Sequence, residues 1–129
     1  MTMLSTAQPI AQPIDLSRRT SALMIVDPTS LEAEAIRGLR TRLIAQHVRE
    51  GRRGLVVCTA SAGSGCSFTA ANLAVAMAEA GHSVGLLDAD VYGYSIPRMM
   101  GADRQPVMMD DLIIPVESHG VRLMSIGFM

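Results

Sequence analysis

The stretch "LVVCTASAGSGCSFTAANLAVAMAEAGHSVGLLDAD", residues 55–90, decides the fold that the sequence predicts. Its apolar, β-branched start at 55–60 indicates a buried strand, and a glycine-rich turn follows. Residues 66–80 are the small and apolar residues of a helix that Gly81 ends. A second apolar run at 84–89 predicts the next strand. Because short links join strand, helix and strand, we expect a right-handed crossover, a parallel sheet and a three-layer α/β fold.

The segments before this stretch predict a tail and one helix. Residues 1–20 are polar and contain the repeat "AQPIAQPI", so we expect a disordered tail there. Residues 21–27 predict a hydrophobic lead-in rather than a short edge strand. Residues 27–48 predict a helix that begins with a capping box of Thr29 and Glu32.

The segments after it predict a loop and two more short strands. Residues 92–111 are loop-rich with at most one helical turn, and we expect strands in 112–116 and near 121–126. An α/β domain of this type needs further strands and helices to cover its sheet. We therefore expect residues 21–129 to be an incomplete domain, truncated at its C-terminus.

The composition argues against several classes of function. With a net charge of −1 and a pI near 6.3, the chain has no electrostatic basis for binding nucleic acid. No apolar run approaches the ~20 residues of a membrane span, so we expect no direct membrane insertion. Cys58 and Cys66 match no zinc pattern, and we expect reduced thiols in a cytoplasmic protein. All 11 basic residues are arginine, so no lysine of this chain can reach a phosphate.

The glycine-rich turn has part of the pattern of a phosphate-binding loop. Such a loop, G-x-x-x-x-G-K-[ST], points backbone N–H groups at phosphate oxygens, while its lysine bridges the terminal phosphates. Gly65 and Ser67 match this pattern, whereas Ala60 replaces the first glycine and Cys66 replaces the lysine. A plain Gly/Ser turn is the alternative interpretation. The candidate nucleotide-binding residues are Gly63, Ser64, Gly65, Cys66, Ser67 and Phe68.

The order of strand, loop, helix and strand, ending in Asp88-Ala-Asp90, resembles the deviant-Walker branch of the P-loop NTPases. This branch is the ParA/MinD-like superfamily. The resemblance implies that Asp88 and Asp90 lie beside the loop as catalytic residues. It also implies that ATP binds with Mg²⁺, for which Ser67 and Asp88 are the candidate ligands. A solvated turn at the end of a strand is the alternative for the two aspartates.

Residues 84–129 resemble one family in this superfamily, the Mrp/ApbC iron–sulfur cluster carrier ATPases. The resemblance lies in "VGLLDADVYGYSIPRMMG" and, after a spacer, "GVRLMSIGFM". It implies ATP and Mg²⁺ as cofactors, and an iron–sulfur cluster only if C-x-x-C ligands lie beyond residue 129. Ser61 departs from this family, whose loop has a second lysine at that position.

Residues 28–83 instead resemble the cytoplasmic domain of bacterial tyrosine kinases that control exopolysaccharide chain length. The resemblance includes E-x-x-R-x-x-R at Glu34, Arg37 and Arg40, which in that family contacts a neighbouring subunit. It implies a homo-oligomer, either a dimer or a ring. An exposed charged helix face explains the same spacing, since Glu34 and Arg37 are i,i+3 neighbours. Tyr92 stands where the kinases have a basic residue.

We therefore expect an ATP-binding P-loop domain of Mrp/ApbC type. Because its loop lacks the lysine, it should bind ATP weakly and hydrolyse it slowly. The alternative is a kinase-like P-loop module, active or inactive, in exopolysaccharide export. A third class is a degenerate P-loop scaffold that binds no nucleotide.

Overall fold

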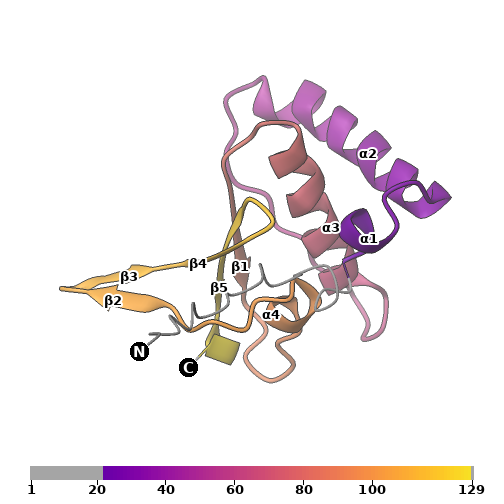
Figure 1. The fold of residues 1–129 in the computed structure, drawn as a ribbon. Coiled ribbons are helices and arrows are strands. Elements are labelled where there is room, and N and C mark those ends of the chain that lie inside the picture. Colours follow the sequence, from indigo (N-terminus) through magenta and orange to yellow (C-terminus); the bar gives the residue numbers. More distant parts are fainter. Residues whose placement is uncertain (1–21, 129) are drawn as a thin grey trace, which may run out of the picture.

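The structure is a computed structural model that describes residues 22–128, apart from the side chains of Leu23 and Val26. The tail expected at residues 1–20 lies outside the described residues. Figure 1 shows helix α3 packed between α2 and a small mixed sheet, from which a two-stranded hairpin projects.

Two helices precede the glycine-rich loop. Helix α1, Leu23–Val26, is a single turn in the hydrophobic lead-in. Helix α2, Leu31–Leu43, continues into a π-helical turn, Ile44–Val48. The predicted helix is confirmed, but the predicted capping box is wrong by one residue. The N-cap is Ser30, whose hydroxyl accepts a hydrogen bond from the Ala33 amide at 3.1 Å.

Helix α3, Cys66–Glu79, confirms the helix predicted at 66–80. It ends in a Schellman motif, in which Gly81 has a φ of 87° and the His82 amide donates to the Met77 carbonyl at 3.2 Å. All residues from 71 to 76 are buried, because α3 packs between α2 and the sheet.

The main sheet has the strand order β1-β5-β4. Strand β1, Val84–Asp88, pairs in parallel with β5, Val121–Ser125, in a register that sets Asp88 opposite Ser125. Strand β4, Val116–Ser118, pairs antiparallel with β5. The β1–β5 pair confirms the α/β class, the predicted parallel pairing and two of the predicted strands, in a sheet that β4 makes mixed.

One short helix and a separate hairpin lie between β1 and β4. Helix α4, Ile96–Met99, is the single helical turn that the sequence predicts in this region. Strands β2, Val107–Met109, and β3, Leu112–Ile114, pair antiparallel with each other. Strand β2 was not predicted from the sequence. A 3₁₀ turn, Ile126–Phe128, follows β5.

Residues 55–60 form no strand, so that prediction is wrong. A strand exists through a ladder with a neighbour, and an apolar composition alone does not supply one. The contacts of this segment come from side chains instead. His47 Nε2 lies 2.8 Å from the Gly54 carbonyl oxygen, and the Cys66 thiol donates to the Val57 carbonyl.

The hydrophobic core lies where the helices meet one face of the sheet. Its members include Met24 of α1, Ile36 of α2, Val75 of α3 and Leu123 of β5. The opposite face is open, since Leu87 of β1 is 70% exposed. The described residues thus supply the sheet and one helical layer of the expected three-layer fold.

Candidate functional site

The glycine-rich loop, residues 59–65, is exposed throughout and leads directly into helix α3. Gly63 and Gly65 have φ values of 77° and 85°, in the left-handed region that glycine adopts without strain. The Ser64 hydroxyl donates to the Ser61 carbonyl at 2.7 Å, which holds the loop in a turn. The loop therefore folds back on itself just before the helix begins.

Backbone N–H groups of the loop are available to an anion. Among the described residues, the amides of residues 61–65 donate no hydrogen bond to a protein acceptor. The first turn of an α-helix also leaves its amides without intrahelical partners. Because these groups and the helix dipole attract negative charge, the backbone here fits a phosphate group.

Cys66 is the first residue of α3 and stands where the loop pattern has lysine. Its half-buried thiol donates to the Val57 carbonyl at 3.2 Å, so it is turned toward the preceding segment. No Lys or Arg occurs between residues 59 and 70. The loop therefore offers amides but no cation of its own.

Asp88 is the last residue of β1, and Asp90 comes two residues later. Strand β1 ends at the end of the molecule where α3 begins, the lower end in Figure 1. Asp88 Oδ2 accepts hydrogen bonds from the Ile96 amide at 3.3 Å and the Ser125 hydroxyl at 3.4 Å, and Oδ1 accepts one from the Asp90 amide at 3.2 Å. Asp90 in turn accepts from the Gly93 amide at 2.8 Å. Both carboxylates thus shape the backbone around them.

Ser125 is a site residue that sequence reasoning missed. It holds Asp88 because the parallel register sets these two residues opposite each other at the ends of β1 and β5. The signal was a hydroxyl at the end of a predicted strand, but its partner could be found only from the pairing of strands distant in sequence.

The site fits Mg²⁺ with a nucleotide in part. The hydroxyl of half-buried Ser67 and the carboxylate of Asp88 offer oxygen atoms of the kind that Mg²⁺ binds, and Mg²⁺ takes most of its ligands from water and phosphates. Within residues 22–128, no group of three or more His, Cys, Asp or Glu side chains could hold a metal ion. Phe68, which follows Ser67 in α3, is 38% exposed. No hydrogen bond joins the loop to the two aspartates in this part of the chain.

A cavity of about 210 Å³ lies away from the loop, between the end of α2, α3 and the start of β1. Leu55 and Val57 form one wall, and Val84 and Leu86 of β1 form another. The segment at 55–57 is therefore separated from β1 by a cavity instead of being joined to it by a ladder. Sequence analysis did not anticipate this space.

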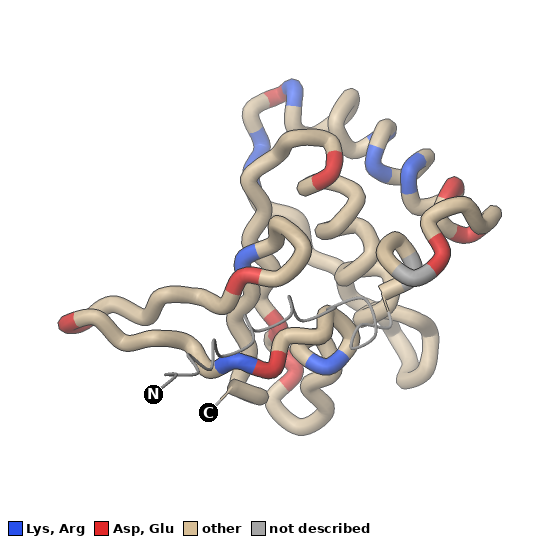
Figure 2. Tube along the Cα trace, in the orientation of Figure 1, with Lys and Arg blue, Asp and Glu red and all other residues tan. Residues whose placement is uncertain are grey.

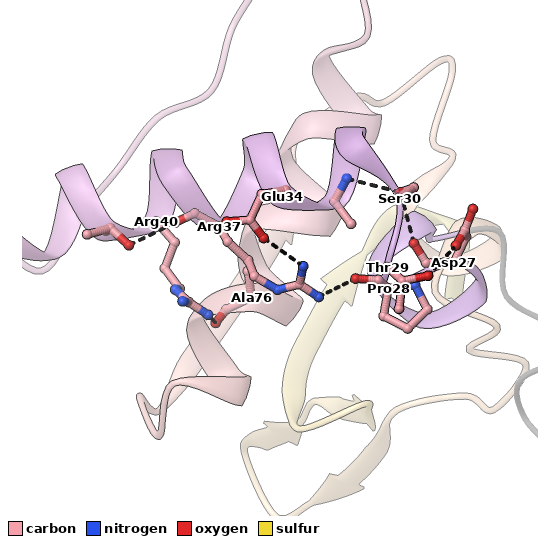
Figure 3. Close-up of polar contacts among 10 residues, drawn as sticks. Asp27, Pro28, Thr29, Ser30, Glu34, Arg37, Arg40 and Ala76 are labelled. Atoms are coloured by element: carbon pink, nitrogen blue, oxygen red, sulfur yellow. Dashed lines mark hydrogen bonds and ion pairs between the residues drawn. The ribbon is translucent and has the colours of Figure 1, made fainter.

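The three residues expected at a subunit contact lie on helix α2, as Figure 3 shows. Arg37 forms an ion pair with Glu34 at 3.2 Å and also donates to the Pro28 carbonyl. Arg40 donates to the Ala76 carbonyl of α3 at 3.4 Å. Both arginines thus have partners within the chain, and their role between subunits stays a prediction.

No helix in the part of the chain that the structure describes has the length and apolarity to cross a membrane. No solved structure matches the chain.

Curated relatives match a little over half of the chain. An iron–sulfur cluster carrier protein of Aquifex aeolicus is 49% identical over 77 residues, 58% of this chain and 21% of the relative. That of Bacillus subtilis is 45% identical over 74 residues, 57% of this chain and 21% of the relative. An Arabidopsis thaliana iron–sulfur protein required for NADH dehydrogenase, mitochondrial, is 47% identical over 77 residues, covering 58% of this chain and 25% of the relative. The chain thus spans between a fifth and a quarter of the length of these relatives.

A family model described as "NUBPL iron-transfer P-loop NTPase", of the ParA group, matches residues 51–129. The matched region contains the loop, helix α3, both aspartates and the parallel strand pair. Because the model covers more than half of the chain, this protein belongs to the ParA/NUBPL family of P-loop NTPases.

Proposed function

We propose that this chain is the ATP-binding part of an iron–sulfur cluster carrier of Mrp/ApbC type, with a degenerate phosphate loop. The observation that carries the proposal is the loop itself. Its unpaired amides at 61–65 precede the N-terminus of α3, and β1, whose last residue is Asp88, ends at the same end of the molecule (Figure 1). An anion site and two carboxylates at one end of the molecule are a combination that suits a nucleotide with Mg²⁺.

Each candidate residue has a role in this proposal. The amides of Gly63 to Ser67 bind phosphate oxygens, with Phe68 continuing the first turn of α3. Ser67 and Asp88 would hold Mg²⁺, and Asp90 would orient the attacking water. When bound, Mg²⁺ would neutralise charge on the phosphates.

The missing cation sets the expected strength of binding. A charge-assisted hydrogen bond contributes roughly 1.5–3 kcal/mol, so Cys66 in place of lysine should weaken ATP binding by about ten- to a hundredfold. Hydrolysis should lose more, because charge on the transferring phosphoryl group needs that stabilisation.

Cluster carriage is proposed for a whole protein of this family, since the chain spans only part of its relatives. Iron–sulfur clusters are held by several thiolates. The chain has two cysteines, at 58 and 66, and no C-x-x-C pattern. In our proposal, this chain therefore supplies the nucleotide site, and the cluster is cargo held elsewhere. The protein works in the cytoplasm.

The experiment is a titration of ATP, with and without Mg²⁺, into the parent chain and the Cys66→Lys variant. We expect restored lysine to tighten binding by about ten- to a hundredfold and to raise turnover. Cys66→Met is the matched control, since it lengthens the side chain without adding charge. If Cys66→Lys and Cys66→Met bind ATP equally, the loop is only a turn and the proposal fails.

A kinase-like homo-oligomer remains the second candidate, and it rests on Glu34, Arg37 and Arg40. Their contacts within the chain do not favour it. Charge reversal of Arg37 and Arg40 should lower the molecular mass measured by light scattering if α2 is a subunit contact. An unchanged mass would show that Arg37 and Arg40 make contacts only within the chain.

A further inference from the structure

The two cysteines of the chain lie at the two ends of the glycine-rich loop and close together in space. Cys58 is exposed and precedes the loop, and half-buried Cys66 begins α3. The Cys66 Sγ is 3.2 Å from the carbonyl oxygen of Val57, and that carbonyl is bonded to the amide nitrogen of Cys58. The described residues contain no cis peptide bond.

This contact limits the distance between the two cysteines. In a trans peptide the carbonyl oxygen lies about 2.8 Å from the next Cα, as standard bond lengths require. The Cys66 Sγ is therefore within about 6 Å of the Cys58 Cα. Because a cysteine Sγ lies about 2.8 Å from its own Cα, the two Cα atoms are at most about 9 Å apart. A disulfide needs Cα atoms about 4.4–6.8 Å apart, so the pair can form one once the segment around Cys58 moves by up to a few ångström.

The segment around Cys58 can make this adjustment. Residues 52–59 belong to no ladder or helix, and the side of residues 55–57 that faces β1 borders a cavity. The backbone at Gly63 and Gly65 is not held by packed neighbours, since no atom lies within 4 Å of the place that a Cβ would take at either residue. The loop can therefore close without disturbing the core.

We propose that Cys58 and Cys66 form a reversible disulfide that closes residues 59–65 into a covalent ring. The oxidant is a low-molecular-weight disulfide such as oxidised glutathione. The thiolate of exposed Cys58 attacks one of its sulfurs, which forms a mixed disulfide and releases one thiol. The thiolate of Cys66 then attacks the Cys58 sulfur and releases the second thiol, so two protons leave the protein and the oxidant is reduced to two thiols.

The disulfide would change the state of the loop. The Cys66 thiol would give up its hydrogen bond to the Val57 carbonyl, and the loop ends would be tied at the point where α3 begins. The site is a redox modification site and does not depend on the proposed nucleotide binding.

The experiment equilibrates the full chain with reduced and oxidised glutathione and then blocks free thiols with iodoacetamide. No Lys or Arg lies between Arg53 and Arg98, so one tryptic peptide, residues 54–98, carries both cysteines. We expect this peptide to lose the mass of two hydrogens and to take up no iodoacetamide. The value of [GSH]²/[GSSG] at half-oxidation, where GSH and GSSG are reduced and oxidised glutathione, gives the effective concentration of one thiol at the other.

Denatured protein provides the reference, because a short loop closes by chance even in an unfolded chain. We expect the effective concentration in native buffer to exceed that in urea by about tenfold or more. The matched variants Cys58→Ser and Cys66→Ser should each keep one glutathione as a mixed disulfide. A native value equal to or below that in urea, or glutathione retained by the parent chain, would overturn the proposal, and neither readout involves a nucleotide.

Discussion

At the scale of single residues, Asn72 shows how one buried polar group joins distant segments. Its side chain is fully buried in α3. Its Oδ1 accepts a hydrogen bond from the Met24 amide at 2.8 Å, and its Nδ2 donates to the Phe68 carbonyl at 2.8 Å. Because α1 is only one turn long, this bond fixes its position on α3.

We expect Asn72→Ala to lower the free energy of unfolding by about 2–4 kcal/mol. The substitution leaves the buried Met24 amide without a partner and creates a small cavity. Urea unfolding followed by circular dichroism measures the change. Thr41→Ala removes an exposed hydroxyl on α2 and should change stability by less than about 0.5 kcal/mol. Equal losses in the two variants would show that the Asn72 contacts contribute little.

The candidate site could be predicted from the sequence as far as local chemistry determines it. Gly63, Gly65 and the start of α3 follow from spacing alone, as do two carboxylates at the end of β1. Two contacts could not be predicted, those of Asp88 with Ser125 and of Cys66 with the Val57 carbonyl. Both depend on where the backbone of another segment lies.

At the scale of elements, the start of α2 separates two hydroxyls that look equivalent in the sequence. Ser30 caps the helix, whereas the Thr29 hydroxyl donates to the Asp27 carboxylate at 3.4 Å (Figure 3). With Ser30 as N-cap, the residue three positions later is Ala33, so the reciprocal bond of a capping box is absent.

Ser30→Ala should cost about 1 kcal/mol of stability, because the Ala33 amide loses its acceptor. Thr29→Ala is the matched control and should cost less than about 0.5 kcal/mol, since that hydroxyl is exposed and caps no helix. Thermal and urea unfolding of both variants would give the comparison. A larger loss of stability for Thr29→Ala would show that Thr29 caps the helix, as the sequence predicts.

The helices were easier to predict than the strands for a physical reason. Helix α3 forms hydrogen bonds within its own sequence and carries its own stop signal in Gly81. Residues 55–60 have the composition of a strand, but a ladder needs a partner, and the matching edge of β1 is not paired with them. Strand β2 shows the reverse case, because a loop-rich composition still pairs when a turn brings β3 beside it.

The turn between β4 and β5 contains a histidine whose titration should affect stability. His119 has a φ of 51°, and its Nε2 is buried without a hydrogen-bond partner in the described structure. Burial removes solvent from the imidazolium and lowers the pKa of His119 below its ordinary value of 6.5. As the pH falls through 6.5, the unfolded chain therefore binds a proton at His119 more readily than the folded chain does.

The contribution of His119 to stability is thus fully present above pH 6.5 and declines as the pH falls toward the lower folded pKa. His119→Asn removes this titration and keeps a residue that tolerates the left-handed turn. We expect urea midpoints of the parent chain to fall more steeply than those of the variant between about pH 7 and about pH 5. Parallel pH profiles would contradict this prediction.

At the scale of the whole molecule, apolar side chains are divided between the core face of the main sheet and an exposed hairpin. Strands β4 and β5 place Val116, Val121 and Leu123 in the core. All six residues of β2 and β3 are exposed and apolar, and Figure 2 shows charge only at the acidic tip of the hairpin. A hairpin with two such faces contributes little to folding by burial, because its side chains remain in water.

Two identical substitutions, one in each place, test this division. Leu123 of β5 is 1% exposed and lies between two strands, so Leu123→Ala should destabilise the fold by about 2–5 kcal/mol. Leu112 of β3 is 72% exposed, and Leu112→Ala should change stability by less than about 0.5 kcal/mol. Urea unfolding of both variants at one pH measures the difference directly. If Leu112→Ala costs as much as Leu123→Ala, the hairpin packs against other residues in solution and this division does not hold.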